Sequence, residues 1–338
     1  MVRAPWRLPG APAPSANRCR AAELPTEPDT VRIAVDLLGG DGAPAVVVDG
    51  ALRALRADPD LSLLLVGPPE VADEFIRALP VADRERVQIR PATPSRAARG
   101  GTTVHTAVAA VAEGEASALV SAGETGATVA AAALGLGRWP GVRRPALIAT
   151  LPAVAGPVVL LDVGGSMEAG PDTLARHAAL GAAYAAVAHG FQHPRVGLLS
   201  VGVEPGKGDD ARRVADPALA GQKLPVGARY IGLVEGYDVS VGERADVVVT
   251  DGFTGNVLLK GIEGAYAMAG GLPTTVDTPR AAALLGVVGT VVACHGSAQL
   301  DDVASGIALA ARLHRRGVTA KISTLVVREE RRETEVTT

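Results

Sequence analysis

The segment Val247–Lys260 constrains the fold more than any other part of the chain. It runs Val-Val-Val-Thr-Asp-Gly-Phe-Thr-Gly-Asn-Val-Leu-Leu-Lys, so a β-branched strand passes through a polar turn with two glycines into the start of a helix. Glycine lets backbone N–H groups approach a ligand closely, and the first turn of a helix carries unpaired N–H donors at the positive end of its dipole. The segment therefore predicts an anion site between a strand and a helix.

Three other turns have the same character. They are Asp36–Asp41, Ser121–Ala127 and His295–Ser297, and the first two directly follow runs of aliphatic or β-branched residues. In α/β proteins the ligands bind at the carboxyl ends of the strands, where turns of this kind gather. We therefore expect these turns to form the binding site.

Short aliphatic runs alternate with helical stretches through most of the chain. This alternation predicts a parallel α/β sheet covered by helices on both faces. The composition agrees, because 48% of the residues are hydrophobic but only 3% are aromatic, which suits close packing of Ala, Val and Leu. Pro152–Pro157 is predicted to join two neighbouring strands as a hairpin-like turn. The predicted strands are residues 31–35, 61–66, 87–89, 118–120, 146–151, 158–161, 196–201, 230–234 and 247–250, and the predicted helices are residues 43–56, 71–79, 102–113, 127–136 and 171–189.

Charge and cysteine content exclude several classes of protein. The net charge of -3 comes from 33 basic and 36 acidic residues without a basic stripe, so we expect no nucleic-acid partner. The only cysteines, Cys19 and Cys294, form no disulfide framework and have no metal-ligand spacing, which indicates the reducing cytoplasm. The longest apolar run, Ala281–Cys294, is shorter than the roughly 20 residues that span a bilayer, so no transmembrane helix is predicted.

The two ends of the chain differ from the region between them. Residues 1–30 are rich in Pro, Ala and Arg without periodicity and are predicted to be a disordered leader. Residues 328–338 are a run of mixed charge and Thr, predicted to be a solvated, frayed tail. One α/β domain is expected over residues 31–327.

Two nucleotide-binding patterns fail on spacing. Gly135–Gly141 has too long a last gap for a dinucleotide fingerprint and follows a helix, whereas that fingerprint follows a strand. Gly202–Gly208 is one residue short of a P-loop, and no Ser or Thr follows Lys207. Neighbouring residues on an extended segment point to opposite faces, so Cys294 and His295 are not expected to activate each other, and Cys294 is interpreted as a small core residue.

Several polar residues keep two interpretations at this stage. Asp36, Asp41 and Asp251 precede glycines at strand ends, where they either cap helices and tight turns or belong to the site. His295, at the end of an apolar run, either faces the ligand cleft or is a structural histidine. Lysine is scarce, so Lys207 in its glycine-rich turn is a stronger candidate than Lys260, which suits a helix surface.

Taken in order, these motifs resemble the bacterial phosphate acyltransferase (PlsX) family, and the resemblance extends from about residue 31 to residue 325. The most specific string is Asp251–Asn256, Asp-Gly-Phe-Thr-Gly-Asn. The other matching strings are Val35–Asp41, Ser121–Ala127, Lys260 with Glu263–Gly264, Leu284–Gly286 with Gly289, and His295–Gly296.

The resemblance implies a fold, a reaction and partners. It implies a three-layer α/β/α fold with a mostly parallel sheet, similar to the isocitrate/isopropylmalate dehydrogenase-like proteins, and a homodimer. The reaction it implies converts an acyl carrier protein thioester and inorganic phosphate into acyl phosphate for phospholipid synthesis, without a cofactor or metal. This chemistry needs a site for the phosphate nucleophile and donors for the tetrahedral oxyanion, and glycine loops at helix N-termini supply both.

The resemblance also implies site residues. Catalytic roles fall to Lys207, His295 and Asn256, with Lys207 and His295 polarising the substrate or transferring a proton. Phosphate and substrate binding falls to the glycine turns, with Asp36 and Asp41 ordering the loops. The binding residues implied are Asp36, Gly39, Gly40, Asp41, Gly123, Thr125, Gly126, Asp251, Thr254 and Gly255.

The chain departs from the family pattern at several positions. Gly42 replaces a His, Glu124 replaces an Asn, and Gly164–Glu168 replaces Gly-Ala-Asn-x-Asp. A carboxylate at residue 124 would repel phosphate at close range unless an arginine paired with it. These changes leave open a non-catalytic or repurposed homologue, or a phosphotransacetylase-like enzyme that uses a coenzyme A thioester. Only Ala265–Arg280 occupies the place of a longer helical hairpin linked to membrane contact in the family, which argues against peripheral membrane binding.

Overall fold

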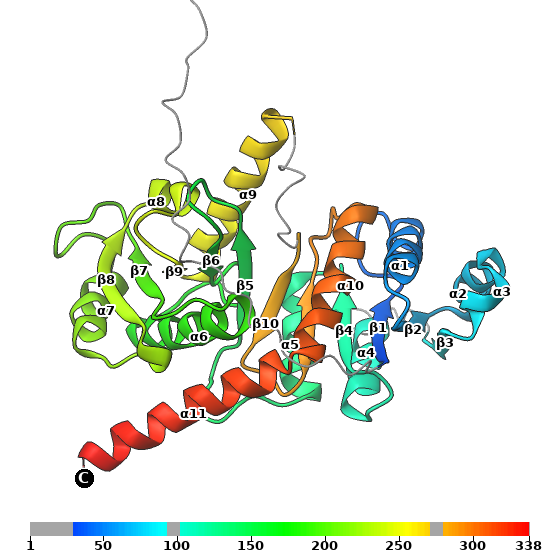
Figure 1. Ribbon diagram of the computed structural model, residues 1–338, viewed down its shortest axis with the longest axis horizontal. Helices are drawn as coiled ribbons and strands as arrows, with labels where there is room; N and C mark the ends of the chain where they lie inside the picture. The colour runs from blue at the N-terminus through cyan, green and yellow to red at the C-terminus, as the bar shows by residue number, and fades with distance from the viewer. Residues whose placement is uncertain (1–29, 93–101, 271–279, 338) are drawn as a thin grey trace, which may run out of the picture.

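The computed structural model describes residues 30–92, 102–270 and 280–337. Its centre is one sheet of eleven strands with helices on both faces, arranged as two lobes (Figure 1). The predicted leader, apart from residue 30, and most of the shortened segment at residues 265–280 lie outside the described residues. The strands are β1 (Val31–Asp36), β2 (Leu61–Gly67), β3 (Val87–Pro91), β4 (Ala118–Ser121), β5 (Ala146–Leu151), β6 (Val158–Leu161), β7 (Arg195–Leu199), β8 (Arg229–Val234), β9 (Val247–Val249), β10 (Ala282–Leu285) and β11 (Thr290–Ala293).

The sheet has two parallel halves joined by antiparallel strands. Its order is β3-β2-β1-β4-β11-β10-β5-β6-β9-β7-β8. The first lobe holds β3, β2, β1, β4 and β11, which are parallel, and the second lobe holds β6, β9, β7 and β8, which are also parallel. Between them, β10 and β5 pair antiparallel with each other and with their outer neighbours. A mostly parallel sheet is therefore correct, whereas a fully parallel one is wrong.

The apolar run before His295 is a β-hairpin, which the sequence pattern alone did not reveal. β10 and β11 pair antiparallel across a turn that contains Gly286 (φ +97°) and Gly289 (φ +129°). These left-handed or related conformations favour glycine, and they let a continuous apolar segment reverse its direction. The hairpin places β11 beside β4, so His295 emerges next to the Gly123 turn.

Strand residues alternate between two hydrophobic cores, one on each face of the sheet. On β1, Ile33 and Val35 belong to the first core while Ala34 belongs to the second. Helices α1, α6, α7, α10 and α11 pack on the first core, and α4, α5, α8 and α9 pack on the second. The helices are α1 (Ala45–Ala57), α2 (Pro69–Ala78), α3 (Val81–Arg84), α4 (Thr102–Ala112), α5 (Thr125–Gly135), α6 (Pro171–His189), α7 (Asp210–Gly221), α8 (Gly236–Val241), α9 (Gly252–Met268), α10 (Leu300–Arg315) and α11 (Val318–Thr337), with a 3-10 turn at Pro225–Gly227.

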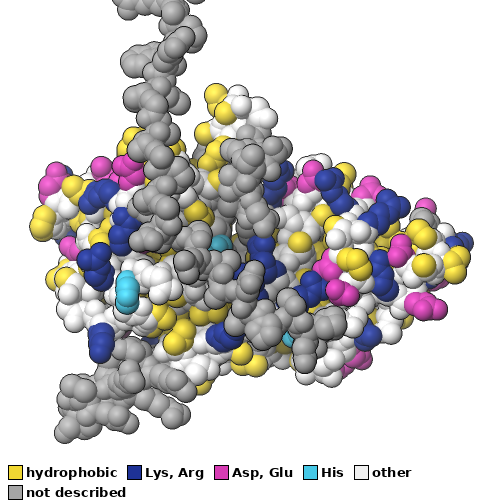
Figure 2. Space-filling view, in the orientation of Figure 1, with side chains coloured by type: hydrophobic (Ala, Val, Ile, Leu, Met, Phe, Trp, Pro, Cys, Tyr) yellow, Lys and Arg dark blue, Asp and Glu magenta, His cyan; other side chains and the backbone are white. Residues whose placement is uncertain are grey.

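The ends of several elements follow their punctuation. α6 has the predicted bounds, with Pro171 in its first turn and Gly190 (φ 73°) in the left-handed conformation after its end. α11 continues as a helix through the predicted charged tail as far as Thr337; it runs from the end of α10 to below the second lobe in Figure 1 and contacts α6. On the face shown in Figure 2, basic and acidic side chains are interspersed over both lobes, as the near-neutral composition predicts.

Candidate active site

Three of the predicted glycine turns meet in the first lobe. A Cβ added to Gly39 would lie 2.6 Å from the amide nitrogen of Gly123, and one added to Gly40 would lie 3.1 Å from the carbonyl oxygen of Gly296. The amide of Asp41 donates to the same Gly296 oxygen at 2.7 Å. Because these backbones touch, the turns after β1, β4 and β11 form one surface, and only glycine permits the approach at Gly39.

The buried side chain of Asp36 connects the turn after β1 to the turn after β4. Its side chain is 3% exposed and accepts the Ser121 hydroxyl at 2.8 Å, and the Ser121 oxygen in turn accepts the Gly123 amide at 3.1 Å. Burial raises the pKa of Asp36, although hydrogen bonds from Thr103, Ser121 and the Leu38 amide partly offset that effect. Asp36 therefore orders the loops without lining the cleft, while Asp41 lies exposed at their rim.

Helix α5 begins at the Gly123 turn without a side-chain cap. Glu124 is its N-cap residue, yet the Glu124 side chain makes no capping hydrogen bond and is exposed. The next residue, Thr125, lines a cleft whose other walls are largely apolar, whereas Gly126 is exposed. Within the part of the chain that the structure describes, no side chain caps this end, so the first-turn N–H groups and the positive end of the α5 dipole are available to an anion beside Thr125.

A buried carboxylate shapes the loop after β6. Asp162 is fully buried and accepts the amides of Leu147 (3.0 Å), Gly164 (3.1 Å), Gly165 (2.7 Å) and Ser166 (2.7 Å), as well as the Ser166 hydroxyl (2.8 Å). Charge-assisted bonds of this kind are the strong ones, and they fix the loop. Gly164, Gly165 and Ser166, which replace the family's Gly-Ala-Asn, are thus held by the Asp162 carboxylate.

Helix α9 uses its first-turn donors internally, which differs from the sequence expectation. The amide of Gly252 donates to Ser166 O at 2.8 Å, that of Phe253 to Met167 O at 3.3 Å, and that of Thr254 to the Asp251 carboxylate at 2.8 Å. These N–H groups are therefore not free to bind an anion. The Thr254 hydroxyl also donates to Asp251, so the predicted phosphate contact of Thr254 stays a prediction.

The glycines of this turn serve close packing. A Cβ on Gly255 would lie 1.9 Å from Asp162 O, and one on Gly252 would lie 2.2 Å from Ser166 O. Both residues are buried against the backbone of another loop, and the predicted phosphate contact of Gly255 stays a prediction. The glycine-bracketed turn seats α9 on the loop after β6, and this seating aims the next residue, Asn256, into the cleft.

Asp251 is held by an arginine that the sequence analysis did not single out. The Arg212 side chain, 7% exposed, lies 2.8 Å from the Asp251 carboxylate and 2.6 Å from that of Asp209, and it also donates to Thr250 Oγ1. Burial acts to raise the pKa of Asp251, but hydrogen bonds from Thr254 and Arg212 outweigh it and hold that pKa below its usual range. Helix α7, which carries Arg212, was not predicted, and Asp251 has a structural role as N-cap of α9.

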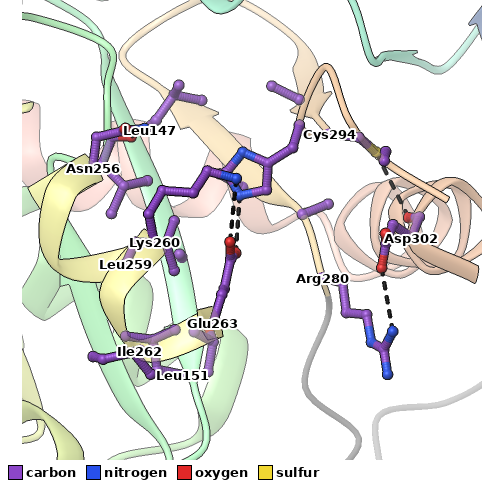
Figure 3. Close-up of a pocket in the computed structure, with 18 of the residues that line it drawn as sticks. Leu147, Leu151, Asn256, Leu259, Lys260, Ile262, Glu263, Arg280, Cys294 and Asp302 are labelled. Atoms are coloured by element: carbon purple, nitrogen blue, oxygen red, sulfur yellow. Dashed lines mark hydrogen bonds and ion pairs between the residues drawn. The ribbon is translucent and has the colours of Figure 1, made fainter. Parts of the chain in front are cut away.

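The cleft lies between α9 and the sheet, and its volume is about 290 Å³. Its floor comes from β5, β10 and β11, and α9 forms one wall (Figure 3). Asn256 donates to Val163 O at 3.1 Å, which fixes one of its two amide hydrogens and leaves the other for a ligand. Thr125 and Asn256 come from different lobes, so the cleft joins the two.

A histidine, a glutamate and a lysine meet across the cleft. His295 Nε2 lies 2.9 Å from Glu263 Oε1, and Lys260 Nζ lies 3.2 Å from Glu263 Oε2 (Figure 3). Burial acts to raise the pKa of Glu263, but the His295 contact and Lys260 outweigh it and lower that pKa. His295 thus faces the cleft, and Glu263, which the sequence analysis noted only as part of a matching string, orients it.

Lys207 lies outside the cleft. It is exposed in the turn after β7, where its stem packs near Gly202, and it does not line the cleft that holds Asn256 and His295. Its predicted catalytic role stays a prediction. Cys294 is 3% exposed, and burial raises its pKa to about 12, in keeping with a core residue.

Among the helices of the described residues, none is both long and apolar enough to cross a bilayer.

Comparison with known proteins gives the family. The profile of the family described as "Fatty acid synthesis protein" matches residues 31–274. The phosphate acyltransferase of Desulfitobacterium hafniense (strain Y51) is 43% identical over 244 residues, covering 69% of this chain and 71% of its own length. That of Thermobifida fusca (strain YX) is 39% identical over 315 residues, covering 83% and 87%, and that of Rhodobacter capsulatus is 35% identical over 355 residues, covering 94% and 88%.

Solved structures share the fold at low sequence identity. A branched-chain phosphotransacylase from Enterococcus faecalis V583 superposes with a TM-score of 0.60 at 16% identity, covering 84% of this chain and 99% of its own. The EutD phosphotransacetylase from Staphylococcus aureus gives a TM-score of 0.56 at 17% identity, covering 87% and 94%. These likenesses establish the three-layer α/β architecture, and the sequence matches establish that the chain belongs to the phosphate acyltransferase (PlsX) family.

Proposed function

We propose that this acyltransferase moves the acyl group of an acyl carrier protein thioester to inorganic phosphate, and that the acyl phosphate serves phospholipid synthesis. The observation that carries the proposal is one cleft that combines an uncapped helix N-terminus with an apolar floor. Phosphate needs the helix N-terminus, and an acyl chain needs the apolar floor. Both substrates can therefore meet in one space shielded by the two lobes.

The chemistry follows from the positions of three groups. Phosphate binds at the first turn of α5 beside Thr125, where the dipole and free amides attract an anion. A phosphate oxygen attacks the thioester carbonyl, and the free amide hydrogen of Asn256 stabilises the oxyanion. The C–S bond then breaks, and His295, oriented by Glu263, supplies a proton to the departing thiolate.

In this proposal the anion binds at the N-terminus of α5, whereas the sequence predicted an anion site at the N-terminus of α9. The α9 amides already have protein acceptors, so Thr254 and Gly255 support the site by seating α9. Gly123 and Gly126 belong to the turn that opens α5 and remain candidates for phosphate contact. Lys207 is exposed on the turn after β7 and lies outside the cleft, so its catalytic role stays a prediction.

Further properties belong to the same proposal. We propose that the fold is related to the isocitrate/isopropylmalate dehydrogenase-like proteins, that the chain forms a homodimer, and that it acts in the cytoplasm. The support is the resemblance of the motifs and the low cysteine content.

A second candidate uses a coenzyme A thioester in place of the carrier protein. It is favoured by the fold shared with structures named phosphotransacetylase and phosphotransacylase. A third, a homologue without turnover, is favoured by the exposed Glu124 carboxylate at the N-terminus of α5, which would repel phosphate.

One experiment separates these candidates. Purified protein is mixed with either thioester, with and without phosphate, and thiol release is followed with a chromogenic disulfide. Phosphate-dependent release from acyl carrier protein supports the first proposal, and release from coenzyme A alone supports the second. Release from neither carrier would show that the chain lacks turnover.

A further inference from the structure

The cleft extends well beyond the groups that the proposed reaction uses. Thr125 and Asn256 lie at one end, and the cleft continues along α9 past Leu259 and Ile262 to Tyr266. An α-helix rises about 1.5 Å per residue, so the wall from Asn256 to Tyr266 is about 15 Å long. Phosphate and a thioester group fill only the first part of this length.

Small side chains line the floor of the cleft and leave room above it. Ala282 of β10 pairs directly with Ala293 of β11, and the pairing of Ala283 with Ile148 brings Ala149 of β5 opposite Ala282 on its other side. The side chains of Ala149, Ala282 and Ala293 all line the cleft. Leu147 and Leu284 form the neighbouring pair on the same face, so larger side chains border these alanines.

The far end of the α9 wall carries an aromatic ring that a hydrogen bond fixes, that of Tyr266. The Tyr266 hydroxyl donates to the carbonyl oxygen of Pro152, which ties α9 to the turn after β5. Leu151 and Ile262 also line the cleft, and they lie close together in Figure 3. Arg280, on the opposite side, is turned to Asp302 at 3.4 Å, so its charge is engaged away from the apolar lining.

We propose that this channel, defined by Ala149, Ala282, Leu259, Ile262 and Tyr266, binds the hydrocarbon tail of the acyl substrate, and that Tyr266 is the stop that sets its preferred length. The inference rests on the proposed function, because the occupant is chosen from the continuity of the channel with Thr125, Asn256 and His295. A tail whose first carbon lies among those groups meets the apolar side chains that α9 contributes to the cleft, Leu259 and Ile262, before it reaches Tyr266.

The channel predicts how affinity depends on chain length. Each buried methylene contributes enough to raise affinity about fourfold, until the tail reaches the stop. Binding of saturated fatty acids from hexanoate to palmitate is measured directly by displacement of a fluorescent fatty acid, which does not require turnover. Affinity should rise steeply with length and then level off.

Two variants move the stop in opposite directions. Ala149→Leu fills the room above the alanines and should weaken palmitate binding at least tenfold while hexanoate binding changes less than twofold. Tyr266→Ala opens the far end and should shift the levelling-off point to longer chains. The matched control is Tyr237→Ala, because Tyr237 is 75% exposed on α8 and lies outside the cleft.

The outcomes separate this inference from the proposed function. If Ala149→Leu does not fold, judged by circular dichroism and its unfolding midpoint, Tyr266→Ala carries the test alone. A length profile unchanged from wild type in every folded variant, or no rise of affinity with length, overturns the channel. Loss of phosphate-dependent thiol release with an intact length profile would instead overturn the reaction and leave the channel standing.

Discussion

At the scale of single residues, the contacts of Glu263 make it a positioning residue for His295. Glu263→Gln keeps the size of the side chain but removes the charge that orients the imidazole, so we expect kcat to fall about 10- to 100-fold. KM for both substrates should change little, and the pH profile of kcat should shift. The control is Glu70→Gln, an exposed residue at the start of α2. Equal kcat in Glu263→Gln and wild type would refute this role.

Glu124 is the second residue-scale prediction. Its carboxylate sits at the start of α5, where two like charges about 4 Å apart in water repel by about 1 kcal/mol per unit charge. Glu124→Asn should therefore lower KM for phosphate about fivefold and leave KM for the thioester unchanged. Initial rates measured against phosphate concentration check it; an unchanged or higher KM for phosphate places the anion away from α5.

Cys294 gives a third residue-scale prediction. Because burial raises its pKa to about 12, the thiolate is scarce near neutral pH and the residue cannot act as a nucleophile. Cys294→Ala should retain at least half of the wild-type kcat. A loss of more than a hundredfold, in a variant with a wild-type unfolding midpoint, would point to a covalent intermediate on this sulfur.

At the scale of elements, α9 is seated through its glycines. Gly255→Ala would place a Cβ 1.9 Å from Asp162 O, so we expect a loss of about 3 kcal/mol or more in the free energy of unfolding. Gly264→Ala is the matched change on the same helix, where a Cβ meets nothing within 4 Å, and it should stabilise by about 0.5–1 kcal/mol. Urea unfolding of both variants checks the pair, and equal effects would contradict the packing.

The contact between α6 and β5 makes the free energy of unfolding depend on pH. His189 bonds to Thr150, and burial together with Arg312 and Arg316 lowers its pKa to about 4. Between pH 6.5 and 4 the unfolded chain binds a proton that the folded chain excludes, so stability falls as pH falls through this window and is unaffected above it. His189→Gln should remove about 2 kcal/mol of the loss between pH 7 and pH 5.

At the scale of the whole molecule, local patterns predicted many of the elements, but they missed α7, α8, α10, α11 and the β10–β11 hairpin. α6 and the hairpin-like turn at Pro152–Pro157 follow from proline and glycine punctuation, which is local. The β10–β11 hairpin was missed because a continuous apolar run shows no periodicity that marks the reversal at Gly286. Glu263 and His295 are 32 residues apart, so only the fold brings them together.

The difference between local patterns and tertiary contacts also explains why the anion site is proposed at α5, whereas the sequence predicted it at α9. The turn at Asp251–Asn256 has the glycines and helix start of an anion site, yet its amides bind Ser166 and Met167, acceptors supplied by a loop distant in sequence. Which helix N-terminus stays free depends on tertiary contacts that no short motif encodes. The α5 turn, with the same pattern, keeps its first-turn amides beside the cleft.

The central claim is that phosphate and an acyl tail meet in one cleft between the lobes. The most direct test follows the reaction of the full chain with acyl carrier protein thioester and inorganic phosphate by 31P NMR. We predict an acyl phosphate resonance that grows in step with the free carrier thiol. Thiol release that yields only free fatty acid, with no acyl phosphate signal, would contradict the claim.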